Sequence, residues 1–276
     1  MLKSLLVGID GSGYSRAAVE LGIAWAKQFD ALLVGLGVID QPGICHPEPV
    51  PLGAGAFKSM LDESRVKRAT KTVEQALEDF SIRCAEAGVA SKPLEDVGDP
   101  VASIAMEAQR YDLILLGQKT YFRLDGSDTE TLEHLLKAPP RPVVCVPESP
   151  QPGEAVLIAY DGSLQAARAL HAFCVSGLSE SATDVHVVTV NNDSKEGHRC
   201  AARAMDYLSF HDIKAQTHIV KESSNPSASL LSQAEEMKAK LLVMGCYGKS
   251  AIREFFLGSV TRTLLDKCPI PLFLFQ

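Results

Sequence analysis

Short apolar runs alternate with longer amphipathic segments along the whole chain. The apolar runs predict strands near 3–9, 31–38, 90–96, 112–117 and 142–147, and again near 154–160, 184–190, 213–220, 240–245 and 270–275. The intervening segments carry apolar residues at helical spacing, as in the predicted helix at 58–87, where Val73, Leu77 and Phe80 share one face. Continuous apolar strands joined by helical crossovers predict parallel sheets that are buried on both faces.

The same order of elements occurs twice. The stretch 4–12 is echoed by 155–163, and both copies end in Asp-Gly-Ser before an Ala-rich helix. The stretches 112–117 and 141–146 are echoed by 240–245 and 270–275. The repeat is roughly 140 residues long, an ordinary size for one domain. We therefore expect two tandem α/β domains, 1–148 and 153–276, joined by a Pro-rich linker.

Composition and charge narrow the class of protein. Of the 276 residues 46% are hydrophobic and 22% charged, and the net charge of −7 disfavours binding to nucleic acid or to anionic membranes. No apolar run approaches the length of a membrane span, and Asp10 follows the first apolar run too soon for a signal peptide. The seven cysteines are odd in number and form no C-x2-C pair, which favours reduced thiols and a cytoplasmic location.

The second copy carries a glycine motif after its fourth predicted strand. Gly245 and Gly248 are followed nine residues later by Gly258 and Ser259, giving the pattern G-x2-G-x9-G-S. Glycines let the backbone approach a charged ligand where a Cβ would collide. The predicted helix that opens with Gly258 offers free N–H groups, hydroxyls and the positive end of its dipole. The motif predicts a phosphate site, whereas the simpler alternative is a set of tight turns and a helix cap without a ligand.

A carboxylate is expected at the same edge of the sheet. Asp161 follows the first strand of the second copy and Gly245 ends its fourth, so both lie at the carboxyl ends of parallel strands, where ligands bind in such folds. One carboxylate beside a phosphate site predicts a nucleotide with its base or ribose near Asp161. An ordinary Asp-Gly-Ser turn is the alternative interpretation.

With these motifs in place, the chain resembles the universal stress protein superfamily in its tandem form, over essentially all of its length. The resemblance implies two doubly wound, Rossmann-like domains with five-stranded parallel sheets, paired through their fifth strands, Val143–Val146 and Leu272–Phe275, as an internal pseudo-dimer. It also implies ATP, with or without Mg, as the ligand of the second domain. By position the family roles fall on Ala159, Tyr160, Asp161, Val190, Met244, Gly245, Gly248, Gly258, Ser259, Val260 and Thr261. The resemblance implies that the first four of these lie at the base, that Met244 and Gly245 lie against the ribose and phosphate, and that the remaining five hold the phosphates.

The first copy departs from the motif. Thr120 stands where the second glycine would be, and residues around Glu130 replace Gly-Ser. A carboxylate there would repel phosphates, so the first domain is not expected to bind a nucleotide in the family manner. Asp10 and the stretch 98–100 survive, which leaves room for a crevice with another ligand.

We expect a stress-response or regulatory protein that binds ATP and changes its surface on binding. No general base is evident beside the motif, so strong catalysis is not predicted, and slow ATP hydrolysis stays open. The alternatives are an adenylating or hydrolytic enzyme of the related adenine-nucleotide hydrolase fold, although its Ser-Gly-Gly-x-Asp-Ser loop is absent, or a nucleotide-free interaction scaffold. A homodimer and an unidentified protein partner are further expectations.

Cys246 is expected to fill space, with redox sensing as the alternative. Cys45-His46 lacks the second ligand pair that a zinc site needs.

Overall fold

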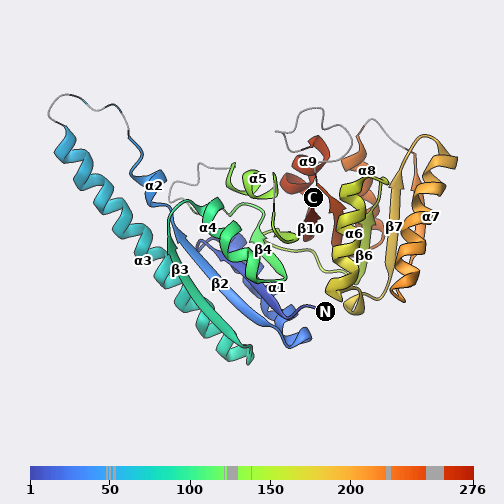
Figure 1. The fold of residues 1–276 in the computed structure, drawn as a ribbon, viewed down its shortest axis with the longest axis horizontal. Helices are drawn as coiled ribbons and strands as arrows, with labels where there is room; N and C mark the ends of the chain where they lie inside the picture. Colours follow the sequence, from blue (N-terminus) through green and yellow to red (C-terminus); the bar gives the residue numbers. More distant parts are fainter. Residues whose placement is uncertain are drawn as a thin grey trace. The chain divides into compact units, whose positions relative to one another are not determined.

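The computed structural model describes residues 1–47, 49, 51, 54–120, 122, 130–137, 139–221, 225–246 and 258–276. The chain divides into two compact units (Figure 1). One comprises Lys3–Leu135, and we call it the N-terminal unit. The other comprises Leu136–Gln276 together with Met1–Leu2, and we call it the C-terminal unit. No helix among the described residues is long and apolar enough to cross a membrane.

The N-terminal unit is built on a parallel sheet with the strand order β3-β2-β1-β4. Its strands are β1 (Ser4–Ile9), β2 (Leu32–Ile39), β3 (Ser91–Val97) and β4 (Leu113–Gly117). Its helices are α1 (Gly13–Phe29), α2 (Gln41–Ile44), α3 (Gly55–Ala87) and α4 (Pro100–Glu107), with a 3-10 turn at Ala108–Arg110; α5 (Glu130–Lys137) begins in this unit and ends in the C-terminal unit. The central strands β1 and β4 are buried along almost their whole length, as their unbroken apolar sequences predict.

The C-terminal unit is built on a sheet with the strand order β5-β10-β9-β6-β7-β8. Its strands are β5 (Val143–Val146), β6 (Ala155–Ala159), β7 (Val185–Val190), β8 (Gln216–Val220), β9 (Ala239–Gly245) and β10 (Leu272–Phe275). Its helices are α6 (Leu164–Ser176), α7 (Ser194–Phe210), α8 (Pro226–Glu236) and α9 (Ser259–Lys267), with a 3-10 turn at Leu178–Ser181. The pairings of β6 to β10 are parallel.

The predicted contact between the two fifth strands is confirmed. β5 pairs antiparallel with β10, with Leu272 opposite Cys145, Phe273 opposite Val144 and Leu274 opposite Val143. The four residues of β5 are buried, and β10 is buried up to Phe275. Each strand therefore satisfies backbone groups that the other would otherwise leave exposed at a sheet edge.

Matching caps place the first helix of each copy against its first strand. In the C-terminal unit, Ser163 accepts a hydrogen bond from the N–H of Ala166 at 3.1 Å and thereby caps α6. Ser12 caps α1 in the same way, accepting from the N–H of Ser15 at 3.1 Å. The preceding glycines, Gly11 and Gly162, both have φ in the left-handed region, at 79° and 73°. The Asp-Gly-Ser sequence is therefore the turn that reverses the chain between strand and helix.

Candidate functional site

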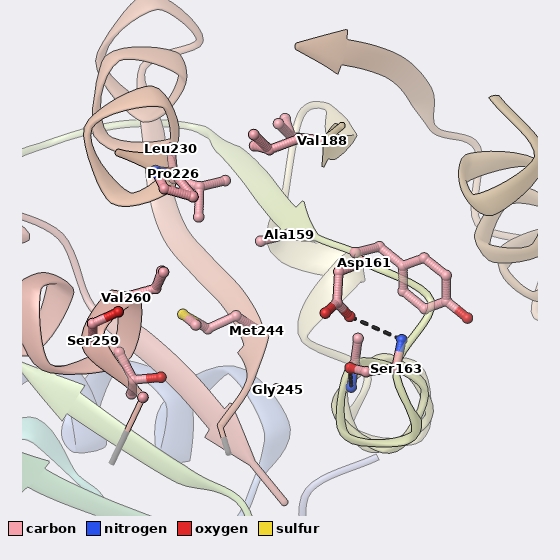
Figure 2. Close-up of a pocket in the computed structure, with 15 residues that line it drawn as sticks. Ala159, Asp161, Ser163, Val188, Pro226, Leu230, Met244, Gly245, Ser259 and Val260 are labelled. Carbon is pink, nitrogen blue, oxygen red and sulfur yellow. Dashed lines mark hydrogen bonds between the residues drawn. The ribbon is translucent and has the colours of Figure 1, made fainter. Parts of the chain in front are cut away.

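A cavity of about 350 Å³ lies within the C-terminal unit at the carboxyl ends of its parallel strands. The ends of β6, β7 and β9 and the first turns of α6, α8 and α9 enclose it (Figure 2). Its walls are formed by Ala159, Tyr160, Asp161, Ser163, Ala166, Val188, Val190, Pro226, Leu230, Met244, Gly245, Gly258, Ser259, Val260 and Thr261. Ten of the eleven residues predicted from the sequence are therefore brought to one cavity. The eleventh, Gly248, lies outside the described residues.

Asp161 is held in the cavity wall by the turn that follows β6. Its Oδ1 accepts a hydrogen bond from the N–H of Ser163 at 2.9 Å, drawn as a dashed line in Figure 2. The left-handed conformation of Gly162 makes this tight turn accessible without strain. A second contact secures the strand end, because the hydroxyl of Thr189 donates to the carbonyl of Tyr160 at 2.8 Å. The backbone N–H of Ser163 thus helps to position the carboxylate.

One part of the cavity is apolar. Figure 2 shows Val188 of β7, Leu230 of α8 and Ala159 of β6 around it, with Met244 between the first turn of α9 and Asp161. Met244 is 7% exposed and Leu230 5% exposed, so both side chains form wall and not surface. An apolar recess with one carboxylate at its rim suits a flat aromatic ring that carries polar edges.

The opposite part of the cavity is the first turn of α9. Gly258 is the N-cap, and among the described residues no side chain caps this helix. Side chains do cap α1, α2, α4, α6, α7 and α8, whereas α3 also begins without a side-chain cap. Within the described part of the chain, the backbone N–H groups at the start of α9 and the positive end of its dipole therefore face the cavity without a side-chain acceptor. Such a helix start is an anion site.

Gly245 has a packing role that the sequence did not indicate. A Cβ built on it would lie 2.5 Å from the backbone nitrogen of Ala166 and 2.5 Å from the carbonyl carbon of Gln165. The end of β9 therefore packs directly on the first turn of α6. By contrast, the nearest described atom that a Cβ on Gly258 would meet is Thr261 Oγ1, at 4.0 Å. Gly245 is a close-packing position of the fold, whereas the described residues leave space beside Gly258.

Burial governs the ionisable groups at the site. Burial raises the pKa of the Tyr160 phenol, and the nearby Cys200 and Asp161 raise it further against the opposing effect of Arg203. The Cys246 thiol is fully buried, and burial raises its pKa to about 12. Burial and a raised pKa both lower the reactivity of a thiol, which favours the expected space-filling role of Cys246 over redox sensing. Among the described residues, no three His, Cys, Asp or Glu side chains are grouped so that they could hold a metal ion.

Five wall residues were not predicted as site residues. They are Ser163, Ala166, Val188, Pro226 and Leu230. Two signals could have identified them. Val188 precedes Val190 by two residues and so shares its face of β7. Pro226 opens α8 directly after its N-cap, Asn225, at the same edge of the sheet as Asp161.

The comparisons with known proteins agree with this architecture. The family model of the universal stress protein family matches residues 1–147 and again 154–276. The chain belongs to the universal stress protein family, in the form with two tandem domains. It is 25% identical over its full length to Universal stress protein Slr1230 from Synechocystis, which it covers completely, and 24% identical to Universal stress protein Rv1996 from Mycobacterium tuberculosis, with 97% of this chain and 93% of that protein covered. The crystal structure of a universal stress protein from Archaeoglobus fulgidus matches 99% of this chain and 98% of its own, with a TM-score of 0.71 and 20% identity.

Proposed function

We propose that the C-terminal unit binds an adenine nucleotide, with ATP as the ligand, in the cavity between β6, β9 and α9. The base would occupy the apolar recess beside Asp161, and the phosphates would meet the first turn of α9. The volume of about 350 Å³ falls within the range of roughly 300 to 1,000 Å³ that is usual for small-molecule sites. A Mg²⁺ ion would arrive with the phosphates and be held mainly by them.

The observation that carries this proposal is the uncapped start of α9 at Gly258, facing the recess that holds Asp161. A helix start without an internal acceptor suits an oxyanion, and an apolar recess suits a base. A nucleotide supplies both in one molecule. The described walls contain one carboxylate, Asp161, and its Oδ1 is engaged by the Ser163 N–H. We therefore propose binding with at most slow hydrolysis, and a regulatory output in the stress response of the cytoplasm, exerted by the monomer or by a homodimer.

The first experiment is to denature the purified protein and identify the released small molecules by mass spectrometry. Recovered ATP supports the proposal. A protein that carries none and fails to bind ATP at 5 mM, about the weakest affinity of biological use, contradicts it and leaves the interaction scaffold. Pyrophosphate release that depends on an added acyl substrate would favour the adenylating enzyme.

A charge placed at the helix start gives a sharper test. In Gly258→Asp the new Cβ enters open space, and the backbone angles, φ −58° and ψ 145°, suit an aspartate that caps α9. The variant should stay folded, yet its carboxylate would take up the free N–H groups and repel phosphates. We expect about a 100-fold loss of ATP affinity, or about 2.7 kcal/mol, measured by calorimetry.

A matched control exists in the N-terminal unit. Gly55 is the first residue of α3, and a Cβ on it would meet no atom within 4 Å. Gly55→Asp therefore makes the same chemical change at another helix start outside the cavity. It should bind ATP as the wild-type protein does, and equal binding by Gly258→Asp would show that the phosphates lie elsewhere.

A further inference from the structure

The N-terminal unit has a counterpart for each wall of the cavity. The repeat aligns 4–12 with 155–163 and 112–117 with 240–245, and the strand pairings β1–β2 and β6–β7 have the same register. The corresponding pairs, with the N-terminal residue first, are Gly8 and Ala159, Val38 and Val190, and Gly117 and Gly245. A cavity could therefore exist at the carboxyl ends of β1, β2 and β4.

Burial differs between the two copies at these positions. Ala159, Val190 and Gly245 are partly exposed, because they face the cavity of the C-terminal unit. Their counterparts in the N-terminal unit are all buried. Since the strand register is the same, we infer that additional atoms of the chain cover the N-terminal positions.

Phe122 supplies part of that cover. Its side chain is 8% exposed, and its Cζ lies 2.9 Å from the position that a Cβ on Gly8 would take. The Leu116 side chain, which corresponds to Met244, meets the same position at 2.4 Å. The phenyl ring therefore lies over the point of β1 where the C-terminal unit has Ala159 in its cavity wall. Phe122 has a φ of 53°, a left-handed conformation that bulky residues rarely adopt.

Thr120 closes the adjoining part. Its Oγ1 lies 2.5 Å from the position of a Cβ on Gly117, so it fills the space beside the end of β4. Thr120 is 4% exposed, and its hydroxyl has no hydrogen-bond partner among the described residues. A buried hydroxyl without a partner is costly, and it is available to any ligand that brings a polar atom.

We propose that Phe122 is an internal plug that occupies the base half of a second, covered site in the N-terminal unit. When the ring is removed or displaced, the site takes an uncharged, flat aromatic heterocycle, whose polar atom pairs with the Thr120 hydroxyl. Charged phosphates are excluded, because Thr120 fills the place of the motif's second glycine. At Gly8, Val38 and Gly117, the chain's own atoms cover the wall of the crevice for which the sequence left room in this copy.

The test removes the phenyl ring of Phe122 and offers indole as a ligand for the space that the ring leaves. Indole is flat, uncharged and carries one N–H group. We expect Phe122→Ala to bind indole at least tenfold more tightly than the wild-type protein does. The readout is methyl NMR, with shifts at Leu116 and at Leu36, the strand neighbour of Gly8. Adding Thr120→Val should weaken the binding about fivefold, the effect of one lost hydrogen bond.

The chain offers a matched control. Phe57 lies in the same unit but is 72% exposed, so Phe57→Ala removes the same side chain without opening a buried space. It should leave the indole response as in the wild type. If Phe122→Ala does not fold, Phe122→Leu keeps a buried apolar side chain, opens a smaller space and should give the same shifts with weaker affinity.

Two results would overturn the plug. One is a folded Phe122→Ala or Phe122→Leu protein whose Leu116 and Leu36 methyl signals do not shift when indole is added. The other is a wild-type protein that responds as strongly as the variants. Neither result bears on ATP binding in the C-terminal unit, because these methyl groups report on the N-terminal unit alone. The two proposals can therefore fail separately.

Discussion

Gly245 and Gln165 pack backbone to backbone: a Cβ on the glycine would lie 2.5 Å from the carbonyl carbon of Gln165. The first copy repeats the relationship, because a Cβ on Gly117 would lie 2.8 Å from the carbonyl carbon of Tyr14. Both glycines end the fourth strand of their copy and face the start of its first helix. The close approach of strand and helix is thus a feature of the fold, and it does not depend on a ligand.

This relationship predicts that Gly245→Val destabilises the protein. The new side chain meets backbone atoms that cannot move independently, so we expect the free energy of unfolding to fall by about 2 kcal/mol or more. Gly258→Ala, whose Cβ enters open space, should cost about 1 kcal/mol or less. Urea denaturation measures both. Equal losses would contradict the distinction between a structural glycine and a ligand-site glycine.

Asp161 has two separable features: its side-chain oxygen accepts a hydrogen bond within the turn, and its carboxylate carries a negative charge. Asp161→Asn keeps an oxygen that accepts the Ser163 N–H, whereas Asp161→Ala loses it. We expect Asp161→Ala to cost about 1 kcal/mol of stability and Asp161→Asn much less. If the carboxylate recognises the base, both variants should weaken ATP binding, and calorimetry would separate that effect from stability.

Asp10 provides the control for this experiment. Its Oδ1 accepts a hydrogen bond from the N–H of Ser12 at 2.9 Å, the same turn in the first copy. Asp10→Ala should therefore lose a similar amount of stability, and ATP binding should be unchanged. A loss of ATP affinity in Asp10→Ala would show that the nucleotide is not confined to the C-terminal unit.

The sequence predicted the fold well where apolar strands and caps coincide. α6 runs from Leu164 to Ser176, as predicted from its cap and its Ala-rich face. β8 was predicted from residue 213 but begins at Gln216, because the N–H of Ile213 bonds to the carbonyl of Leu208 and completes the end of α7. α3 begins at Gly55 and not at 58, since no side chain caps it and the sequence therefore carries no start signal.

The candidate site could be predicted only in part, because some of its residues are brought together by tertiary packing alone. The motif glycines and Asp161 have a spacing that a single sequence reveals, whereas Leu230 enters the cavity wall only through tertiary packing. Phe122 was not predicted either. It comes two residues after Thr120 in a stretch without helical or strand periodicity, and it lies over Gly8 with a left-handed backbone. Neither contact follows from residue type alone.

Cysteine reactivity should separate the one exposed thiol from the buried ones. Burial raises the pKa of Cys174 and Cys246 to about 12, and that of Cys268 to about 11. These groups stay protonated at pH 8 and are shielded from reagents, while Cys45 is exposed. We expect iodoacetamide to label Cys45 in the native protein and the others only after denaturation, as read by mass spectrometry. Cys45→Ser should abolish the labelling of the native protein. Rapid labelling of Cys246 in the native protein would contradict this prediction and favour redox sensing by Cys246.

A histidine pair should make the stability depend on pH. Nδ1 of His186 in β7 lies 3.0 Å from Nε2 of His218 in β8, a distance at which one ring must accept a proton that the other donates. Burial lowers the pKa of His186, the charge of His218 lowers it further, and Asp184 acts in the opposite direction.

Because the pKa of His186 is lower in the folded than in the unfolded chain, the unfolded chain binds more protons as the pH falls below about 6.5. The contribution of the pair to stability is therefore complete above that pH and is lost as the pH falls through the folded pKa. We expect urea midpoints to fall between pH 7 and pH 5, and His186→Gln to flatten this dependence. His46→Gln, at an exposed histidine, should leave the slope unchanged. A slope that survives in His186→Gln would assign the pH dependence to other groups.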